Sequence, residues 1–298
     1  MTERFLITGG LGCVGAWVAR TIAQEGNQAV IYDPGTDDAR LRLITTAEER
    51  ERIRFVPGDV TDVEALMSVI ADGGITHVVH LAALQAPYCR DDPVLGAQVN
   101  VVGTVAVFEA VAGAAMSSTV AYASSAAAYD PSGRGRPSTL YGVFKLADEG
   151  VAEVYARDRG VRSVGLRPAC VYGPGRDRGI TAAVTEAMVA AGAGRPYRLP
   201  FCGRLHLHFA GDVAAAFVAA ARSGDPGALV RAMPSEGLVD MRDLVAMLDR
   251  LNPGAASWIE IGDSPLPFPE ELPGVPLEIP LTSLIDGIHA TQRVAVGV

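Results

Sequence analysis

Short apolar runs alternate with amphipathic stretches along the N-terminal half of the chain. Each run has the length of a buried strand, and the stretch after it repeats apolar residues at helical spacing. The expected strands cover residues 5–8, 29–32, 53–56, 77–81, 120–123 and 164–167. Strands that alternate with helices predict one parallel sheet with right-handed crossovers and helices on both faces. We therefore expect an α/β fold with a doubly wound parallel sheet.

The turn after the first expected strand is rich in glycine. Residues 9–15 read Gly-Gly-Leu-Gly-Cys-Val-Gly and lead into a helical pattern that Gly26 closes. Glycines in this context allow backbone N–H groups to approach a pyrophosphate at the helix N-terminus, where the helix dipole favours negative charge. The pattern predicts a Rossmann-type dinucleotide site. The residues expected to hold the dinucleotide here are Gly9, Gly12, Cys13, Val14 and Gly15.

Asp33 ends the second expected strand and indicates NAD as the dinucleotide. A carboxylate at this position accepts both hydroxyls of the adenosine ribose and repels a 2′-phosphate. The alternative role of Asp33 is that of a turn residue before a Pro-Gly pair. Because of Arg40 and Arg42, NADP remains a minor alternative to NAD. Ala82 and Ala83, after the fourth strand, are small enough to let the backbone pass beside a cofactor.

Lys145 is the single lysine among 25 lysine and arginine residues. Tyr141 lies four residues earlier, so on a helix the phenol and the ammonium share one face. Ser125 lies upstream, just after the fifth expected strand. A planar guanidinium cannot replace a compact ammonium beneath a phenol and a ribose. The three residues predict a proton-transfer site, and the alternative is a lysine left by drift on a solvated helix face.

The chemistry of this trio also follows from ordinary acidities. A tyrosine has a pKa of about 10, so deprotonation near neutral pH needs a shift of roughly three units, or about 4 kcal/mol. One cation within about 4–6 Å supplies roughly 1–3 units. Lys145 and a positive nicotinamide ring would act together. Tyr141 would then take the proton of a secondary alcohol while hydride passes to NAD, and Ser125 would hold the developing oxyanion.

The pattern loosens after Pro168, and a second unit is expected there. Its expected elements are helices at 181–191, 241–251 and 281–291, an extended piece at 197–209 and a helix from Asp212. Residues 265–280 hold six prolines and must be irregular or extended. We expect a Rossmann domain of residues 1–167 with about 206–232. A smaller substrate-binding subdomain of about 168–205 with 233–298 completes the chain.

The amino-acid composition limits which binding partners and which cellular compartment are expected for the protein. Hydrophobic residues make up 49% of the 298 residues and the mean hydropathy is +0.23, which is ample for a large core. A net charge of -9 and a pI near 5.1 argue against nucleic acid and an anionic membrane surface. No apolar run reaches membrane-spanning length, because Gly, Pro or charge interrupts each one, and the first strand leaves no room for a signal peptide. The four cysteines are widely spaced, which favours a reduced, cytoplasmic protein.

Together these motifs resemble the extended short-chain dehydrogenase/reductase family, in its NAD-dependent sugar epimerase and dehydratase branch. The resemblance rests on residues 8–15, 33, 59–60, 80–83, 100, 124–125, 141–145 and 167–175. It implies that Ser125 orients the substrate hydroxyl, that Tyr141 is the acid and base, and that Lys145 binds the nicotinamide ribose. The further cofactor contacts that it implies are Asp59, Val60, Leu81, Ala82, Ala83, Asn100, Ser124, Pro168 and Val171. Members commonly dimerise through two helices, here about 96–112 and 141–157, so a homodimer is expected.

Two alanines after Ser125 depart from part of this family. Dehydratases and decarboxylases of the family carry Asp or Glu after the catalytic Ser or Thr, and reductase-epimerases carry Cys at the second place. Here these places hold Ala126 and Ala127, which have no proton to move. Dehydration and carbon-acid epimerisation are therefore disfavoured. Simple alcohol oxidation remains, as does oxidation followed by re-reduction in the manner of the family's 4-epimerases.

The expected diphosphate clamp is also missing. Nucleotide-sugar members place an arginine seven residues before the position of Asp212, where this chain has Leu205, with Arg204 one residue away. A smaller polyol or sugar acid is therefore an open alternative to a nucleotide sugar. The candidate substrate contacts are Gln85, Ser125, Arg176, Arg204 and His206.

Some of these candidate residues could have a role other than substrate binding. Arg176, Arg178 and Arg204 could each meet an anionic group or be surface charge. His206 and His208 share a face if their segment is a strand. A metal site needs a third ligand, and none is visible, so no metal is expected.

The competing functional class is an NAD-sensing regulator that keeps the fold without the chemistry. Such a protein could bind NAD with its tyrosine or lysine replaced. Tyr141 and Lys145 are both present with Ser125. An enzyme acting on a small sugar-like molecule is therefore favoured.

Overall fold

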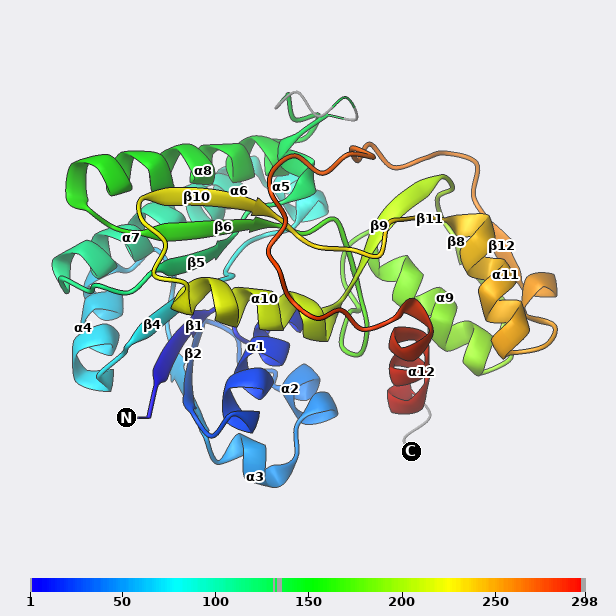
Figure 1. The fold of residues 1–298 in the computed structure, drawn as a ribbon, viewed down its shortest axis with the longest axis horizontal. Coiled ribbons are helices and arrows are strands. Elements are labelled where there is room, and N and C mark those ends of the chain that lie inside the picture. The colour runs from blue at the N-terminus through cyan, green and yellow to red at the C-terminus, as the bar shows by residue number, and fades with distance from the viewer. Residues whose placement is uncertain (1, 131, 133–135, 296–298) are drawn as a thin grey trace.

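The computed structural model describes residues 2–130, 132 and 136–295. Within these residues the main sheet has seven parallel strands in the order β10-β6-β5-β4-β1-β2-β3 (Figure 1). The strands are β1 (Arg4–Thr8), β2 (Gln28–Asp33), β3 (Ile53–Pro57), β4 (His77–His80), β5 (Val120–Ala123), β6 (Ser163–Arg167) and β10 (Ala228–Ala232). The strand order reverses between β1 and β4, so the sheet is doubly wound. The predicted fold class is confirmed.

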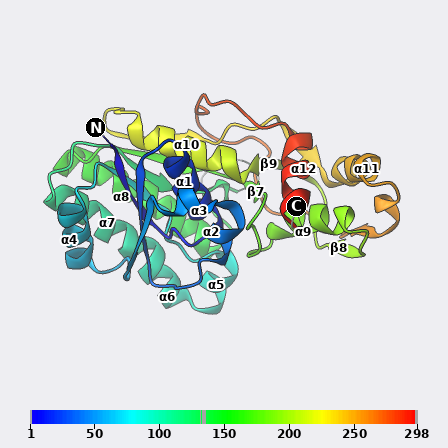
Figure 2. The same ribbon diagram turned by 90° about the horizontal axis from the view of Figure 1, so that it is seen from below.

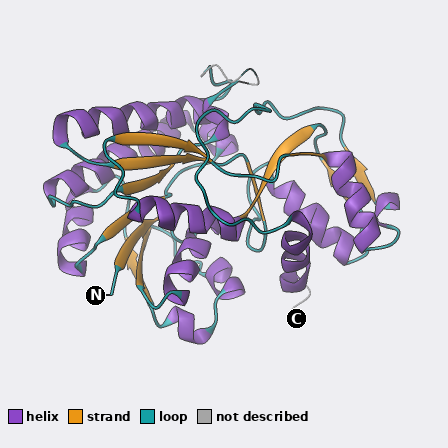
Figure 3. Cartoon of the chain, in the orientation of Figure 1, coloured by secondary structure: helices purple, strands orange, loops and turns teal. Residues whose placement is uncertain are grey.

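Helices cover both faces of this sheet (Figure 1, Figure 3). On one face α1 (Cys13–Gln24) packs against α10 (Ala210–Arg222), and the other face carries α4 (Val63–Gly73), α7 (Gly103–Gly113) and α8 (Leu140–Arg159). Successive side chains of a strand point to opposite faces, so Leu6 and Ile7 enter two separate cores. Both are fully buried. This burial explains why the strands read as continuous apolar runs.

The helix ends follow local signals in the sequence. Gly26 follows α1 with φ +81°, a conformation that glycine adopts without a steric cost. Asp62 caps α4 by accepting a hydrogen bond from the Ala65 N–H at 3.0 Å. Thr139 caps α8 in the same way, with the Gly142 N–H as donor at 3.1 Å. The last cap fixes where the first turn of α8 begins.

The remaining elements lie beyond one end of the main sheet (Figure 2). Of the described residues, β7 (Cys170–Tyr172), β9 (Arg204–Phe209) and β11 (Leu238–Asp240) form one small sheet, and β8 (Tyr197–Leu199) and β12 (Ile259–Ile261) form another. The helices around them are α9 (Ala182–Gly192), α11 (Met241–Leu251) and α12 (Leu284–Ala295). The shorter helical elements of the chain are α2 (Ala39–Ile44), α3 (Ala47–Arg50), α5 (Ala86–Asp91), α6 (Pro93–Ala97), the π turn Gln98–Val102, η2 (Ala126–Ala128) and η3 (Ala255–Ser257). The expected extended piece at 197–209 is thus two strands.

The proline-rich segment 265–280 has no helix or strand, as predicted. It runs past the end of β10, where Ala232 N–H donates to the Val275 carbonyl at 3.2 Å and Leu277 N–H donates to the Ala232 carbonyl at 3.3 Å. The segment therefore returns to the main sheet before the chain enters α12 (Figure 1).

One expectation about apolar runs was wrong. The continuous helical stretch Pro93–Gly113 is long and apolar enough to cross a membrane by length and composition. Its proline does not interrupt the helix, because Pro93 is the first residue of α6, where a missing N–H costs no hydrogen bond, and the π turn at 98–102 continues the helix into α7. Half of its most apolar window is buried, and α7 packs between α4 and α8. A core helix passes the same test.

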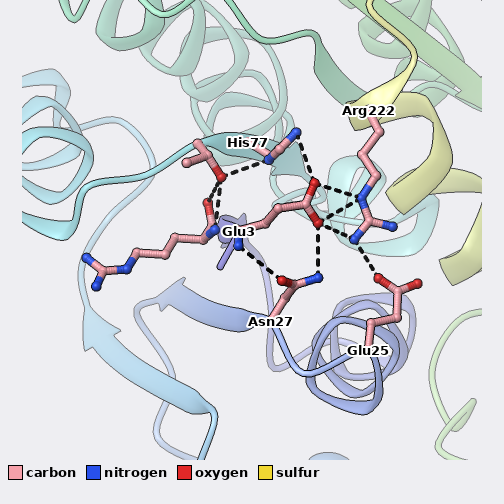
Figure 4. A network of polar contacts seen from close by, with 7 residues as sticks. Glu3, Glu25, Asn27, His77 and Arg222 are labelled. Atoms are coloured by element: carbon pink, nitrogen blue, oxygen red, sulfur yellow. Dashed lines mark hydrogen bonds and ion pairs between the residues drawn. The ribbon is translucent and has the colours of Figure 1, made fainter. Parts of the chain in front are cut away.

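A polar network joins four elements at the amino edge of the main sheet (Figure 4). Arg222, at the end of α10, bonds the carboxylates of both Glu3 and Glu25. Glu3 also accepts a hydrogen bond from the Asn27 amide at 3.0 Å and lies 3.8 Å from the His77 ring. The network ties β1, α1, β4 and α10 together at the edge opposite the strands' carboxyl ends.

Candidate active site at the carboxyl edge of the sheet

The glycine turn after β1 forms a cradle that larger residues could not form. A Cβ at Gly9, where φ is +70°, would lie 2.6 Å from the Ala82 nitrogen, and one at Gly15 would lie 2.4 Å from the Gly9 carbonyl oxygen. Gly12 N–H donates to that carbonyl at 3.1 Å, and α1 starts at Cys13. The cradle and the N–H groups of the helix start fit the pyrophosphate of a dinucleotide.

Asp33 lies beside this turn and accepts two backbone N–H bonds, one on each carboxylate oxygen, at 2.9 and 3.2 Å. Each oxygen keeps a lone pair for a ribose hydroxyl. The two arginines that left an opening for NADP have carboxylate partners. Arg40 lies 2.7 Å from Asp177, and Arg42 lies 2.8 Å from Asp38. These pairings favour NAD over NADP.

The other predicted cofactor residues come from neighbouring strand ends. Asp59 and Val60 follow β3; Leu81, Ala82 and Ala83 follow β4; Ser124 follows β5; Pro168 follows β6; and Val171 lies in β7. Asn100 lies in the π turn and is fully buried. Its amide bonds both the N–H and the carbonyl of Leu84, at 2.6 and 2.9 Å. Asn100 therefore fixes the backbone that follows β4.

Ser125 and Tyr141 lie in turns that pack against each other. Ser125 begins η2, and its Oγ accepts a hydrogen bond from the Ala127 N–H at 3.1 Å. A Cβ at Gly142 would lie only 2.1 Å from the Ala127 carbonyl oxygen. The glycine after Tyr141 thus allows the first turn of α8 to approach the Ser125 turn closely.

Lys145 is fully buried beneath Tyr141. Its side chain is 2% exposed, and its Nζ lies 5.9 Å from the centroid of the Tyr141 ring. Asp148, 1% exposed, receives the ammonium at 3.1 Å. Burial disfavours the charge, but Asp148 and Tyr141 outweigh burial and raise the pKa of Lys145 above its ordinary value. The alternative of a solvated surface lysine is therefore wrong.

A second buried ion pair holds the segment before Ser125. Arg167, at the end of β6, donates two hydrogen bonds to Glu149, both at 2.7 Å. Ser124 donates to the same carboxylate at 2.5 Å. Arg167 also bonds the Tyr129 hydroxyl and the Pro273 carbonyl. The sequence reasoning missed Asp148 and Glu149, although both lie one helical turn after Lys145, where a charged residue shares its face.

His80 completes the polar layer under the site. One ring nitrogen lies 2.7 Å from the Thr8 hydroxyl, and the other lies 3.0 Å from the Thr104 hydroxyl. Burial, with a contribution from Lys145, lowers the pKa of His80 to about 3. His80 is therefore a neutral ring that joins β1 and β4 to α7.

Comparison with known proteins identifies the family. The model of the NAD dependent epimerase/dehydratase family matches residues 5–231. The chain belongs to this family. The predicted family is confirmed, and the family's description agrees with the predicted enzyme type and NAD cofactor.

Individual relatives in this family match the chain over only part of their own length. UDP-glucuronate 4-epimerase 4 of Arabidopsis thaliana is 31% identical over 186 residues, which are 57% of this chain and 42% of that protein. UDP-glucose 4-epimerase of Mycolicibacterium smegmatis is 30% identical over 203 residues, or 63% of each chain. The chain thus spans less than half the length of the Arabidopsis relative.

Solved structures show the same fold over the whole chain. The NAD complex of Thermus thermophilus UDP-glucose 4-epimerase superposes with a TM-score of 0.78 at 23% identity and covers 99% of both chains. The complex of MoeE5 with UDP-glucose and NAD gives 0.79 at 22% identity, again with 99% of both chains covered. The architecture of this family member is therefore that of these proteins.

The candidate substrate residues of this family member fall into two groups. In the first, Arg204 is ion-paired with Glu270 on the surface, and the His206 ring bonds the Ser235 hydroxyl and the Glu270 carbonyl at 2.7 and 2.8 Å. Leu205, at the place of the expected clamp, is buried. These side chains have partners within the chain.

The second group is Gln85 and Arg176, which the fold brings together. Gln85 Oε1 and Arg176 Nη2 both lie within 3.6 Å of the position that a Cβ on Gly179 would occupy. Arg178, two residues after Arg176, is exposed. Among the described residues, no group of three His, Cys, Asp or Glu side chains is arranged to hold a metal ion.

Proposed function

We propose that the chain is an NAD-dependent oxidoreductase or epimerase that acts on a secondary alcohol of a sugar-like substrate. The observation that carries the proposal is the buried ammonium of Lys145 beneath Tyr141. Ser125 lies in the turn against which the Tyr141 turn packs. The glycine cradle for NAD lies at the same edge of the sheet, which is where ligands bind in this architecture.

Each residue of the trio has a separate task in this proposal. NAD bound at the glycine turn supplies the acceptor for the hydride that leaves the alcohol carbon. Tyr141 takes the proton of the alcohol hydroxyl. Lys145 stabilises by its charge the phenolate form of Tyr141 that accepts this proton, and Ser125 donates a hydrogen bond to the developing oxyanion. Re-reduction from the opposite face would return the same proton from Tyr141 and complete an epimerisation.

The residues around the trio limit the reaction type. Ala126 and Ala127 form the turn after Ser125 and have no group for a second proton transfer. Two curated relatives are named as 4-epimerases of UDP-sugars, which supports oxidation followed by re-reduction. Dehydrogenation of a small sugar acid or polyol is the second candidate, favoured by the buried Leu205 at the clamp position. A non-catalytic NAD sensor would have no need for the buried Lys145.

Steady-state kinetics test the proposal. NADH formation and epimerisation would be followed with UDP-glucose, UDP-glucuronate and a panel of sugar acids and polyols. Tyr141→Phe removes only the hydroxyl, so turnover should fall by more than about 100-fold while NAD still binds. Full turnover by Tyr141→Phe would contradict the proposal, and so would a wild-type protein that turns over none of these alcohols.

We also infer a cytoplasmic homodimer without nucleic acid or membrane as a partner. The net charge of -9 supports the absence of these partners. The two helical stretches predicted for dimerisation carry exposed apolar side chains, among them Val102, Val143 and Val154, which are 44–50% exposed. Sedimentation should give a dimer for the wild type and a monomer for Val102→Glu. The division into a Rossmann domain and a substrate subdomain likewise stays a proposal.

A further inference from the structure

The loop after β7 crosses from the small sheet to the start of α1. Trp17 Nε1 donates to the Pro174 carbonyl at 2.9 Å, and Asp177 pairs with Arg40 at 2.7 Å. Arg176 lies between these two anchors. Cys13 Sγ, at the start of α1, lies 3.9 Å from the same Pro174 carbonyl oxygen, two residues before Arg176. Arg176 is therefore held close to the glycine turn.

The guanidinium of Arg176 is only partly satisfied. Its Nη2 donates to the Thr181 hydroxyl at 2.9 Å, while its Nε is buried without a hydrogen-bond partner. In the described part of the chain no carboxylate lies within ion-pair distance of it. A buried donor on a cation is costly unless an acceptor, best an anion, meets it.

Gln85 presents a second unsatisfied atom at the same place. Its Oε1 is buried without a partner and lies 2.3 Å from the position of a Cβ on Gly179, where Arg176 Nη2 lies at 3.6 Å. Gly179 has φ +84° and no side chain, which leaves room for both groups. The backbone before Gln85 is clamped by Asn100. The orphaned Oε1 of Gln85 and the Arg176 guanidinium, whose Nε also lacks a partner, thus approach the same glycine from distant segments.

The position of this pair relates it to the proposed chemistry. β4 lies between β1, which ends in the glycine turn, and β5, which leads to Ser125. The other two arginines under consideration are unsuited, because Arg204 is occupied by Glu270 and Arg178 is exposed. Arg176 is thus the one of these three arginines that is neither ion-paired with a carboxylate nor exposed.

We propose that Arg176 and Gln85 form a subsite for the carboxylate of a sugar acid, so that the substrate belongs to the uronates or aldonates. The planar guanidinium would bind the carboxylate oxygens through Nε and Nη. Gln85 Oε1 would accept a hydrogen bond from a neighbouring hydroxyl of the sugar. The inference rests on the proposed function for the alcohol placed at Ser125 and Tyr141. The cofactor pyrophosphate has the same anionic oxygens, but the glycine turn already supplies donors to it.

Calorimetry on the protein saturated with NAD tests the subsite with matched probes. D-Glucuronate and D-gluconate would be compared with the neutral D-glucose and D-glucitol. The acids should bind the wild type at least about 10-fold more tightly than their neutral counterparts, which corresponds to about 1.4 kcal/mol. Arg176→Gln should remove this preference. Arg178→Gln, an exposed arginine of the same loop, should keep it.

A second variant keeps the test decisive if Arg176→Gln folds poorly. Gln85→Glu has nearly the same shape and places a carboxylate beside Arg176. It should abolish the preference for acids without lowering Tm. Acids that bind no more tightly than neutral sugars, or a preference that survives both variants, would overturn the proposal.

Parallel titrations separate the two sources of anionic oxygens. With a substrate carboxylate as the ligand, Arg176→Gln should change the Kd of NAD by less than about threefold. A tenfold or larger loss of NAD affinity with an unchanged preference for acids would assign the subsite to the cofactor and overturn the substrate class. Because these are binding measurements, they remain valid even if Tyr141→Phe retains turnover and the proposed chemistry fails.

Discussion

Two polar clusters occupy opposite edges of the same parallel sheet and differ in how their charges are balanced. At the amino edge, Arg222 pairs with Glu3 and Glu25 (Figure 4). These side chains are about one-third exposed. At the carboxyl edge, Lys145 pairs with Asp148, and both are at most 2% exposed. Water solvates the first cluster, whereas the second depends on the chain for every contact.

The two clusters also differ in how completely their polar atoms are hydrogen-bonded. The charged side chains at the amino edge join four elements and also remain in contact with water. At the carboxyl edge, Asp148 Oδ1, Gln85 Oε1 and Arg176 Nε are buried without partners. Buried polar atoms without hydrogen bonds lower the free energy of unfolding, so a fold retains them where a ligand completes them. Gln85 Oε1 and Arg176 Nε are therefore candidates for contact with a ligand at the carboxyl edge.

The largest expected effect comes from breaking a buried pair. Glu149→Gln leaves the Arg167 guanidinium buried without its counter-ion and should lower the free energy of unfolding by about 3–5 kcal/mol. Glu25→Gln at the amino edge removes one partner of a solvated arginine and should cost less than about 1 kcal/mol. Urea unfolding of both variants measures the contrast, and equal losses would contradict it.

Lowering the pH should reveal the same difference between the two edges, with a smaller change in the free energy of unfolding. His80 has a pKa of about 3 in the folded protein and about 6.5 when unfolded, so between these values the unfolded chain binds the extra proton. Stability should therefore fall as the pH drops below about 6.5, by about 2 kcal/mol from this group between pH 7 and pH 5. Urea unfolding at both pH values should show that His80→Gln removes this part of the loss.

The matched control for the acid experiment is His77→Gln at the amino edge. Burial lowers the pKa of His77, but Glu3 opposes this change. The His77 variant should therefore lose nearly as much stability between pH 7 and pH 5 as the wild type does. A His77 variant as acid-resistant as the His80 variant would show that the two edges do not differ.

The smallest expected effect concerns the surface arginine near the missing clamp. Arg204→Gln breaks an exposed pair with Glu270 and should change the free energy of unfolding by less than about 1 kcal/mol. UDP at about 1 mM with NAD present should likewise stabilise the protein only slightly in a thermal shift. Stabilisation near 3 kcal/mol would mean a ligand at about 100 times its Kd, and would restore a nucleotide-sugar clamp.

The parts of the site that depend on local spacing could be predicted from the sequence. The glycine turn follows from a strand, its glycines and a helix within one short segment. Tyr141 and Lys145 follow from a spacing of four residues on one helix. The fold class follows from the alternation of apolar runs and amphipathic stretches.

The remaining parts depend on contacts between distant segments or on burial. Asp148 and Glu149 look like surface charges on α8 until the packing of α7 and β6 buries them. The partner of Arg204 lies 66 residues away, and the two partners of His206 lie 29 and 64 residues away. The meeting of Gln85 with Arg176 requires the loop after β7 to cross the sheet. No pattern in the sequence specifies such pairings.

The pH–rate profile of Lys145→Arg tests the central claim most directly, using the alcohol that the NADH assay identifies. The claim is that the compact ammonium beneath Tyr141 holds the phenol ready to lose its proton. The guanidinium keeps the charge but does not fit the buried niche. Turnover should fall by at least about 100-fold, or about 2.7 kcal/mol, and the basic-side requirement should move to higher pH. Near-wild-type turnover with an unmoved profile would contradict the account.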